Sequence, residues 1–314
     1  MPNEFITPEV IAARALATLY NNTVLLPLVH RDFQDDFSGK QGDTVTVRVP
    51  LVFEAKEYDR DTGIEIQDAT QDRFPVSLDK IVDVSFEVTS EEMLLEIDDF
   101  DETLLSPAME AISQKVDFDL ATELVAAARQ NGNPSGDYVQ KQDGGGVVES
   151  ADPDHPAKVL IAARTVLGRA KMPLLNRRAV VSPEGAGELL GDALLHEADK
   201  RGDTDGLIEA AIGRKFGFDS YETQVLGEGA TDVGAVDGLG FHRDAVTIAT
   251  RLLPQPLGKR DGTAASKSYK GLGLRVVYGY DMDRKSDVVS IDTLYGTRAV
   301  RPQGCVELDL GQGS

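Results

Sequence analysis

The stretch from Ser106 to Gln130, SPAMEAISQKVDFDLATELVAAARQ, constrains the fold more than any other part of the chain. Ser106 can cap a helix, Pro107 suits its first position, and the NGNPSGD that follows is rich in helix breakers. Twenty-five helical residues form a rod of about 37 Å. Its apolar residues recur at spacings of three or four and form one stripe, which other parts of the chain must cover. The stripe consists of Met109, Ile112, Val116, Leu120 and Leu124.

Two strand-like runs flank a charged span nearer the N-terminus. Residues 42–50 (GDTVTVRVP) and 75–89 (PVSLDKIVDVSFEVT) alternate apolar and polar side chains, with the period of a half-buried strand. The polar span EAKEYDRDTGIEIQDATQDR, residues 54–73, lies between them. This pattern predicts a long hairpin with a charged tip. Because an isolated two-stranded hairpin is marginal in water, we expect the hairpin of residues 42–89 to pack mainly on a neighbouring subunit.

The rest of the chain mixes helix and strand patterns. Thr7, Pro8 and Glu9 start a predicted N-terminal helix, with an apolar stripe at Val10, Ala13, Leu16 (or Ala17) and Tyr20. This helix could lie on its own core or on another chain. VLLPLVHRDF, which contains Pro27, predicts an extended arm, and the glycine-rich residues 143–156 predict a boundary. Beyond it we expect helices at 158–171, 185–199 and 206–217, strands at 177–183, 218–226, 271–283 and 287–302, and a strand or helix at 240–253.

Composition excludes several classes of protein. The 314 residues carry a net charge of −21, which argues against a surface built to grip nucleic acid through its phosphates. No apolar run reaches the roughly 18 residues that span a bilayer, and the N-terminus shows no signal-peptide pattern. Cys305, the single cysteine, cannot form an internal disulfide and is expected to be a small core residue.

The sequence offers weak candidates for chemistry. It contains no nucleophile elbow, phosphate loop or dinucleotide fingerprint, and its four histidines lack metal-ligand spacing. DKRGDTDG, residues 199–206, matches only part of a calcium loop. Asp281, Asp283 and Asp287 could ligate a hard metal ion, but Lys285 lies among them and a charged strand face is the better explanation. We therefore predict no catalytic residue, cofactor or metal site.

The order of these segments resembles the major capsid proteins of tailed bacteriophages, the HK97-like fold family. TPEVIAARALATLYNNTVLLPLVHRDF followed by GDTVTVRVP is similar to the family's N-terminal arm and the entry to its extended loop. DDFDETLLSPAMEAISQKVDFDLA is similar to the spine helix, IGRKFGFDSYETQVL and GFHRDAVTIATR to the axial domain, and LYGTRAVRPQGCVEL to the closing segment. The resemblance covers most of the chain and rests on the order of its parts, because no single part is a catalytic signature.

The resemblance implies an α+β fold in five parts. These are an N-terminal arm (1–40), an extended β-hairpin loop (41–90), a peripheral domain with the spine helix (91–150), a mixed α/β axial domain (151–274) and a return to the peripheral domain (275–314). In this layout the last strands complete the sheet of the peripheral domain. The apolar stripe of the spine helix is then expected to pack on strands from residues 275–310.

The same resemblance implies a structural protein rather than an enzyme: a virion capsid subunit that assembles in the bacterial cytoplasm into hexamers and pentamers. The shell would enclose double-stranded DNA without reading its sequence. No scaffold-like N-terminal extension is evident, so a separate scaffolding protein is expected, with a portal; decoration proteins are left open. Candidate contacts between subunits are Arg48, Lys56, Arg60, Arg73, Arg298 and Arg301.

Two alternatives remain at this point. An encapsulin-type protein compartment shares the fold and would enclose a cargo enzyme in place of DNA. A metal-dependent enzyme using Asp281, Asp283 and Asp287 belongs to a different class and would bind metal stoichiometrically without forming large particles.

Overall fold

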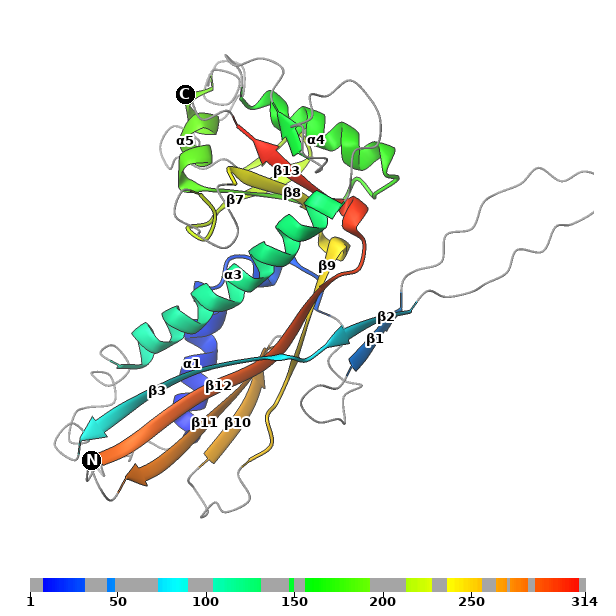
Figure 1. Cartoon of the computed structure of the whole chain (residues 1–314). Coiled ribbons are helices and arrows are strands. Elements are labelled where there is room, and N and C mark those ends of the chain that lie inside the picture. Colours follow the sequence, from blue (N-terminus) through cyan, green and yellow to red (C-terminus); the bar gives the residue numbers. More distant parts are fainter. Residues whose placement is uncertain are drawn as a thin grey trace, which may run out of the picture.

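The computed structural model describes most of the chain (Figure 1). The described residues are 8–31, 44–48, 73–89, 104–130, 147–149, 156–192, 213–227, 236–255, 264–269, 272–281 and 286–310. Within these ranges no helix combines the length and apolar character that crossing a bilayer requires.

The predicted long helix is present as α3, Ser106–Gln130, and its stripe lies in the core. Met109, Ile112, Leu120 and Leu124 are fully buried and Val116 is 1% exposed. They share one cluster with Val276, Val289 and Ile291 of the sheet strands, which confirms that the stripe packs on strands from the C-terminal part of the chain. Figure 1 shows α3 running from one sheet of the molecule to the other.

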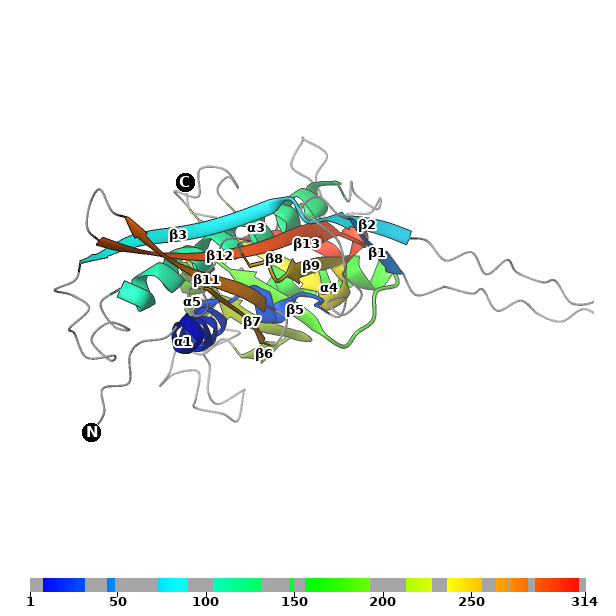
Figure 2. The ribbon, with the colours of Figure 1, turned by 90° about the horizontal axis from the view of Figure 1, so that it is seen from below.

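A five-stranded antiparallel sheet carries the first part of α3. Its order is β10-β11-β12-β3, and β9 pairs with the far part of β12. Helix α3 packs on β12 and β3, and helix α1 (Pro8–Asn22) packs on β10 and β11. Figure 2 shows β3 and α1 at opposite edges of this layer. The strands are β3 (Lys80–Thr89), β9 (Val246–Arg251), β10 (Ala264–Tyr269), β11 (Leu272–Asp281) and β12 (Ser286–Ala299).

A six-stranded mixed sheet forms the second part, in the order β4-β13-β8-β5-β7-β6. Successive residues of a strand face opposite sides, so Val180 joins the α3 core while Ala179 and Val181 join a second core under α4 and α5. The elements are β4 (Val147–Glu149), α4 (Lys158–Arg169), β5 (Arg177–Val181), α5 (Pro183–Gly191), β6 (Arg214–Lys215), β7 (Phe218–Glu222), β8 (Gly238–His242) and β13 (Cys305–Asp309). Short 3-10 helices η4 (Arg243–Ala245) and η5 (Pro302–Gly304) precede β9 and β13.

Strand pairing differs from the expected segment boundaries at three places. β4, expected in the peripheral part, pairs with β13 in the six-stranded sheet. β9 and β10, expected in the axial part, pair into the five-stranded sheet. β13, expected to return to the peripheral sheet, instead pairs with β8 and β4 in the six-stranded sheet. The alternation of apolar residues identifies a strand but not its partner, so the pattern could not separate these assignments.

The predicted hairpin is present in part. β1 (Thr44–Arg48) pairs antiparallel with β2 (Arg73–Ser77). The second run was expected to be one strand, 75–89, but it divides after Ser77. β3 pairs with β12 of the same chain, so residues 80–89 pack within their own chain, contrary to the expectation that the whole hairpin packs on a neighbour. Residues 49–72, which include the predicted tip, lie outside the described residues. Figure 1 shows β1 and β2 to one side of the sheet.

The N-terminal segment lies on the core of its own chain. Helix α1 is present as predicted, but its buried face is a different one: Val10 and Ala13 are exposed. The arm after it forms the 3-10 helix η1 (Leu26–Leu28), whose two leucines are buried, and His30 bridges to Thr247 beside β9. The buried residues of α1 are Ile11, Ala12, Ala15, Leu16 and Leu19.

Candidate functional site

The end of the hairpin nearest the five-stranded sheet, at Pro75–Ser77 of β2, is called the hairpin root. It is fixed where β2 crosses β12. A Cβ atom added at Gly296 of β12 would lie 1.9 Å from the Ser77 carbonyl oxygen, so only glycine permits this approach. One residue pair away, the Arg298 guanidinium donates a hydrogen bond to the Pro75 carbonyl. A small apolar cluster closes the junction and contains Val76, Leu78, Ala249, Leu294 and Val300.

The six predicted contact residues lie at four different places in the chain. Arg48 and Arg73 face each other in the register of β1 and β2, and Lys56 and Arg60 lie outside the described residues. Arg298 holds the hairpin root of its own chain. The Arg301 N–H donates to the Ala245 carbonyl at the start of η5. A role for any of these six in contacts between subunits stays a prediction.

Helix α3 carries a buried polar cluster that sequence reasoning missed. Asp119 accepts a hydrogen bond from the Tyr295 hydroxyl of β12 at 2.8 Å. Its carboxylate also lies 3.3 Å from Lys80 Nζ of β3 and 3.1 Å from Lys115 Nζ. Burial alone would raise the pKa of Asp119, but the hydroxyl and the two ammonium groups outweigh it and hold the pKa below its usual range. The cluster ties the spine helix to two strands of the five-stranded sheet.

Further contacts join α3 to the end of the chain. The Arg129 guanidinium donates to both carboxylate oxygens of Glu307 in β13, at 3.1 and 3.4 Å. The Glu123 carboxylate accepts the Ala299 N–H at 2.8 Å, just after β12 pairs with β9. Helix α3 is therefore bonded to both sheets, because β12 and β13 belong to different ones.

Asp117 attaches the N-terminal segment to α3. The Val24 and Leu25 N–H groups donate to its two carboxylate oxygens at 2.7 and 3.1 Å. Burial raises the pKa of Asp117 to about 6, and the backbone N–H groups only partly offset this. In the unfolded chain the carboxyl returns to its ordinary pKa, so the folded protein binds this proton more tightly.

Replacing Asp117 is expected to change the pH dependence of stability. Its folded-state pKa is raised, so its favourable contribution is complete below pH 4 and is lost as the pH rises through about 6. Relative to Asp117→Asn, the wild type should gain about 1 kcal/mol of unfolding free energy between pH 7.5 and pH 5. Urea unfolding of both proteins at the two pH values measures this. A difference that does not change with pH would contradict the raised pKa.

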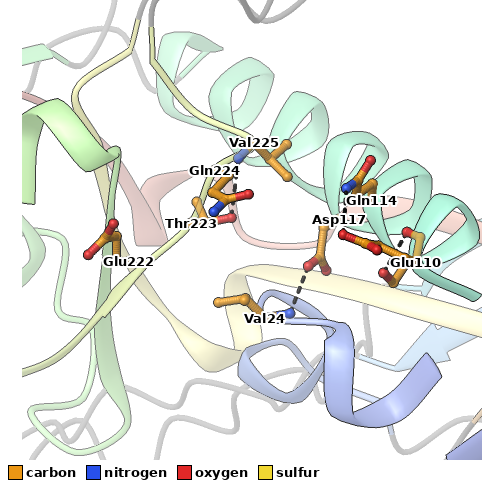
Figure 3. Close-up of a pocket in the computed structure, with 9 residues that line it drawn as sticks. Val24, Glu110, Gln114, Asp117, Glu222, Thr223, Gln224 and Val225 are labelled. Carbon is orange, nitrogen blue, oxygen red and sulfur yellow. Dashed lines mark hydrogen bonds between the residues drawn. The ribbon is translucent and has the colours of Figure 1, made fainter. Parts of the chain in front are cut away.

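A pocket of about 480 Å³ opens beside Asp117 (Figure 3). It lies between α3, the segment after α1 and the end of β7. Three carboxylates line it and its described lining includes no lysine or arginine, so its potential is negative. Its lining residues are Val24, Glu110, Ser113, Gln114, Asp117, Glu222, Thr223, Gln224 and Val225.

The candidates for chemistry find no support in the described residues. Asp287 lies on β12 opposite Tyr280, while Asp283 and the segment 199–206 lie outside the described ranges. No group of three or more potential metal ligands occurs among the described residues. Cys305 is buried in the core as predicted, and burial raises the pKa of its thiol, so it is a poor nucleophile.

The residues that fix this framework gave faint signals in the sequence. Asp117 and Asp119 flank the stripe of α3, and an acid near a buried helix face needs a partner. Gly296 interrupts a strand pattern, which often marks a close backbone approach. Both signals indicate that the residue makes a contact, but neither identifies the partner residue.

Comparison with known proteins rests on structure, since neither a family sequence model nor a curated protein sequence matches the chain. A structure from mycobacterium phage Che8 matches with TM-score 0.63 and 21% identity, over 92% of this chain and 91% of that one. The capsid of cyanophage P-SCSP1u matches with TM-score 0.62 and 12% identity, over 91% and 87%. The mature capsid of bacteriophage PhiM1 matches with TM-score 0.57 and 15% identity, over 91% and 86%. The predicted fold class is thereby confirmed, and the chain has the α+β, HK97-like fold of tailed-phage capsid proteins.

Proposed function

We propose that this chain is the shell subunit of a tailed-phage capsid and assembles into the hexamers and pentamers of an icosahedral particle that encloses double-stranded DNA. The observation that supports this best is the extent of the structural match. It covers about nine-tenths of this chain and almost as much of the phage proteins. The role is structural rather than enzymatic.

The charge of the chain supports the same proposal. A shell subunit with a net charge of −21 would repel packaged DNA, so the DNA could enter and leave without binding tightly. The proposal includes assembly in the host cytoplasm with a separate scaffolding protein and a portal, and it leaves room for decoration proteins.

Electron microscopy of the expressed protein tests the proposal. We expect negative stain to show closed, uniform shells, and particles recovered from phage to hold nuclease-protected double-stranded DNA. A co-purifying cargo enzyme in place of DNA would favour the protein compartment. A monomer that binds metal stoichiometrically and forms no particles would overturn the structural role altogether.

Assembly is also expected to depend on salt. A chain with this net charge must overcome self-repulsion, and exposed ion pairs of about 0–1 kcal/mol each repeat many times in a closed shell. Salt screens both the pairs and the repulsion. Light scattering across a range of ionic strengths measures particle yield, and a flat yield would contradict an electrostatic contribution.

A further inference from the structure

One segment of this acidic chain contains no acidic residue at all. Residues 155–183 carry six lysines and arginines, no aspartate and no glutamate. The other 285 residues therefore carry a net charge of −27. Charge is thus separated along the chain, and the fold determines whether the separation persists in space.

Three of the six cations, Arg164, Arg169 and Lys171, are exposed, and they lie on α4 and on the loop that leads to β5. We call this surface of α4 and the loop the basic face. Leu174 and Leu175 at its centre are 62% and 68% exposed, the two largest exposures among the exposed large apolar residues of the described chain. The exposed residues of the basic face are Ile161, Arg164, Gly168, Arg169, Lys171, Pro173, Leu174, Leu175 and Asn176.

The loop that presents the two leucines is held rigidly. Arg177, only 2% exposed, donates hydrogen bonds from its guanidinium to the carbonyls of Pro173 and Met172 at 2.8 Å and of Arg164 at 3.1 Å. The Arg243 N–H donates to the Asn176 carbonyl, and the buried His242 ring hydrogen bonds to the Leu175 backbone. The leucines are therefore exposed by a fixed scaffold and not by a loose loop.

Two residues of this loop adopt a backbone conformation that side chains disfavour. Lys171 and Asn176 have φ values of 55° and 59°. At Lys171 this conformation closes the C-terminus of α4, where the Lys171 N–H donates to the Gly168 carbonyl and the Met172 N–H donates to the Leu167 carbonyl. At Asn176 it is common, because asparagine tolerates the left-handed region better than most residues.

The chemistry of the basic face favours a protein partner over DNA. Binding to phosphates needs cations and gains nothing from exposed leucines. Protein interfaces have an apolar centre with a charged and polar rim, and arginine is enriched in them. The partner must be acidic, and the acidic surface available in every assembled shell is that of another copy of this chain.

The complementary surface is the acidic pocket next to Asp117. Glu110 of α3 and Glu222 of β7 are exposed at its rim. Figures 1 and 2 show α4 on the side of the chain where β1 and β2 lie, and β7 and α5 on the other side. Opposite charges on opposite sides favour a head-to-tail contact, which closes into a ring when the rotation between neighbours divides the full circle.

We propose that the basic face of one subunit docks on the acidic pocket of the next subunit in the same ring. Leu174 and Leu175 form the buried centre of this contact, and Arg164 and Lys171 pair with the carboxylates at the rim of the pocket. The contact rests on the proposed function and adds to it the pair of surfaces that join neighbours.

Charge reversal on each side tests the contact. The first variant is Arg164→Glu with Lys171→Glu, and the second is Glu110→Lys with Glu222→Lys. All four positions are exposed, so both proteins should fold with melting temperatures near that of the wild type. Each variant alone should yield at least tenfold fewer particles, measured by sedimentation and negative stain.

Mixing the two variants in equal amounts provides the decisive measurement. In an alternating ring, each reversed basic face meets a reversed pocket and each native basic face meets a native pocket. Even-numbered rings should therefore form from the mixture although neither variant assembles alone. Leu174→Ser with Leu175→Ser should also lose particles, and mixing with the pocket variant should not restore them.

The control is Lys267→Glu on β10, which reverses a charge on an edge strand of the five-stranded sheet, outside both surfaces, and should assemble normally. The proposed contact is contradicted if the basic-face variant assembles as well as the wild type, whether or not the variant binds less DNA. It is also contradicted if the mixture fails to form rings. If the wild type forms no particles, the proposed shell function fails. The contact is then tested on the self-association of the protein in solution: each variant alone should self-associate less than the wild type, and the mixture of the two should recover the association.

Discussion

Leu120→Asp is expected to abolish the soluble, folded subunit. Leu120 is fully buried at the middle of α3, in the cluster that joins the helix to the five-stranded sheet. An aspartate there would place an unpaired carboxylate in an apolar core, at a cost of several kcal/mol. That is comparable to the whole stability of an ordinary domain, about 5–15 kcal/mol. The fraction of soluble protein and its melting temperature measure the effect.

Ala111→Asp is the matched control, because it introduces the same carboxylate at an exposed position of the same helix. It lies near the N-terminal end of α3, where negative charge is tolerated well. This variant should remain soluble and melt within a few degrees of the wild type. A soluble Leu120→Asp protein with an unchanged melting temperature would mean that the α3 stripe does not form the core.

Gly296→Ala is expected to displace the hairpin root while leaving the sheets folded. The new methyl group would lie 1.9 Å from the Ser77 carbonyl oxygen and 2.8 Å from its carbonyl carbon. Backbone atoms cannot yield as a flexible side chain does, so β2 has to move away from β12. Overpacking of this kind costs about 1–3 kcal/mol, and it should also break the hydrogen bond from Arg298 to Pro75. We expect a modest loss of thermal stability and a large loss of particles.

Gly279→Ala controls for the general effect of alanine in a strand. Gly279 lies on β11, and a Cβ there would meet no atom within 4 Å. It should assemble at the wild-type yield. If Gly296→Ala also assembles at that yield, the direction of the hairpin is not set by its root.

The features that depend on neighbouring residues could be predicted from the sequence. The stripe of α3 follows from a helical repeat, and the caps that bound the helix lie within a few residues of its ends. The buried face of α1 was harder to predict, because alanines occupy several positions of the helix and the apolar pattern fits more than one face. The structure places Ala12 and Ala15, rather than Ala13, against the core.

Features that depend on distant segments could not be predicted in the same way. Alternation in residues 75–89 is interrupted at Lys80 and Ile81, where the pairing partner changes, but the interruption does not identify the new partner. Asp117, Glu222 and Val24 meet at one pocket although they come from three separate parts of the chain. The predicted fold specifies the arrangement of helices and strands, but no local pattern specifies which side chains this arrangement brings together.

Strand β12 makes the subunit a mechanically continuous body. Its 14 residues pair with β3 and β11 and then with β9, β2 crosses it at Gly296, and the chain passes through η5 directly into β13. A force on the hairpin directed along β12 would load these backbone hydrogen bonds in shear, so that many must break together rather than one after another. A displacement at the hairpin would then tilt both sheets as one body instead of unravelling the strand nearest to it.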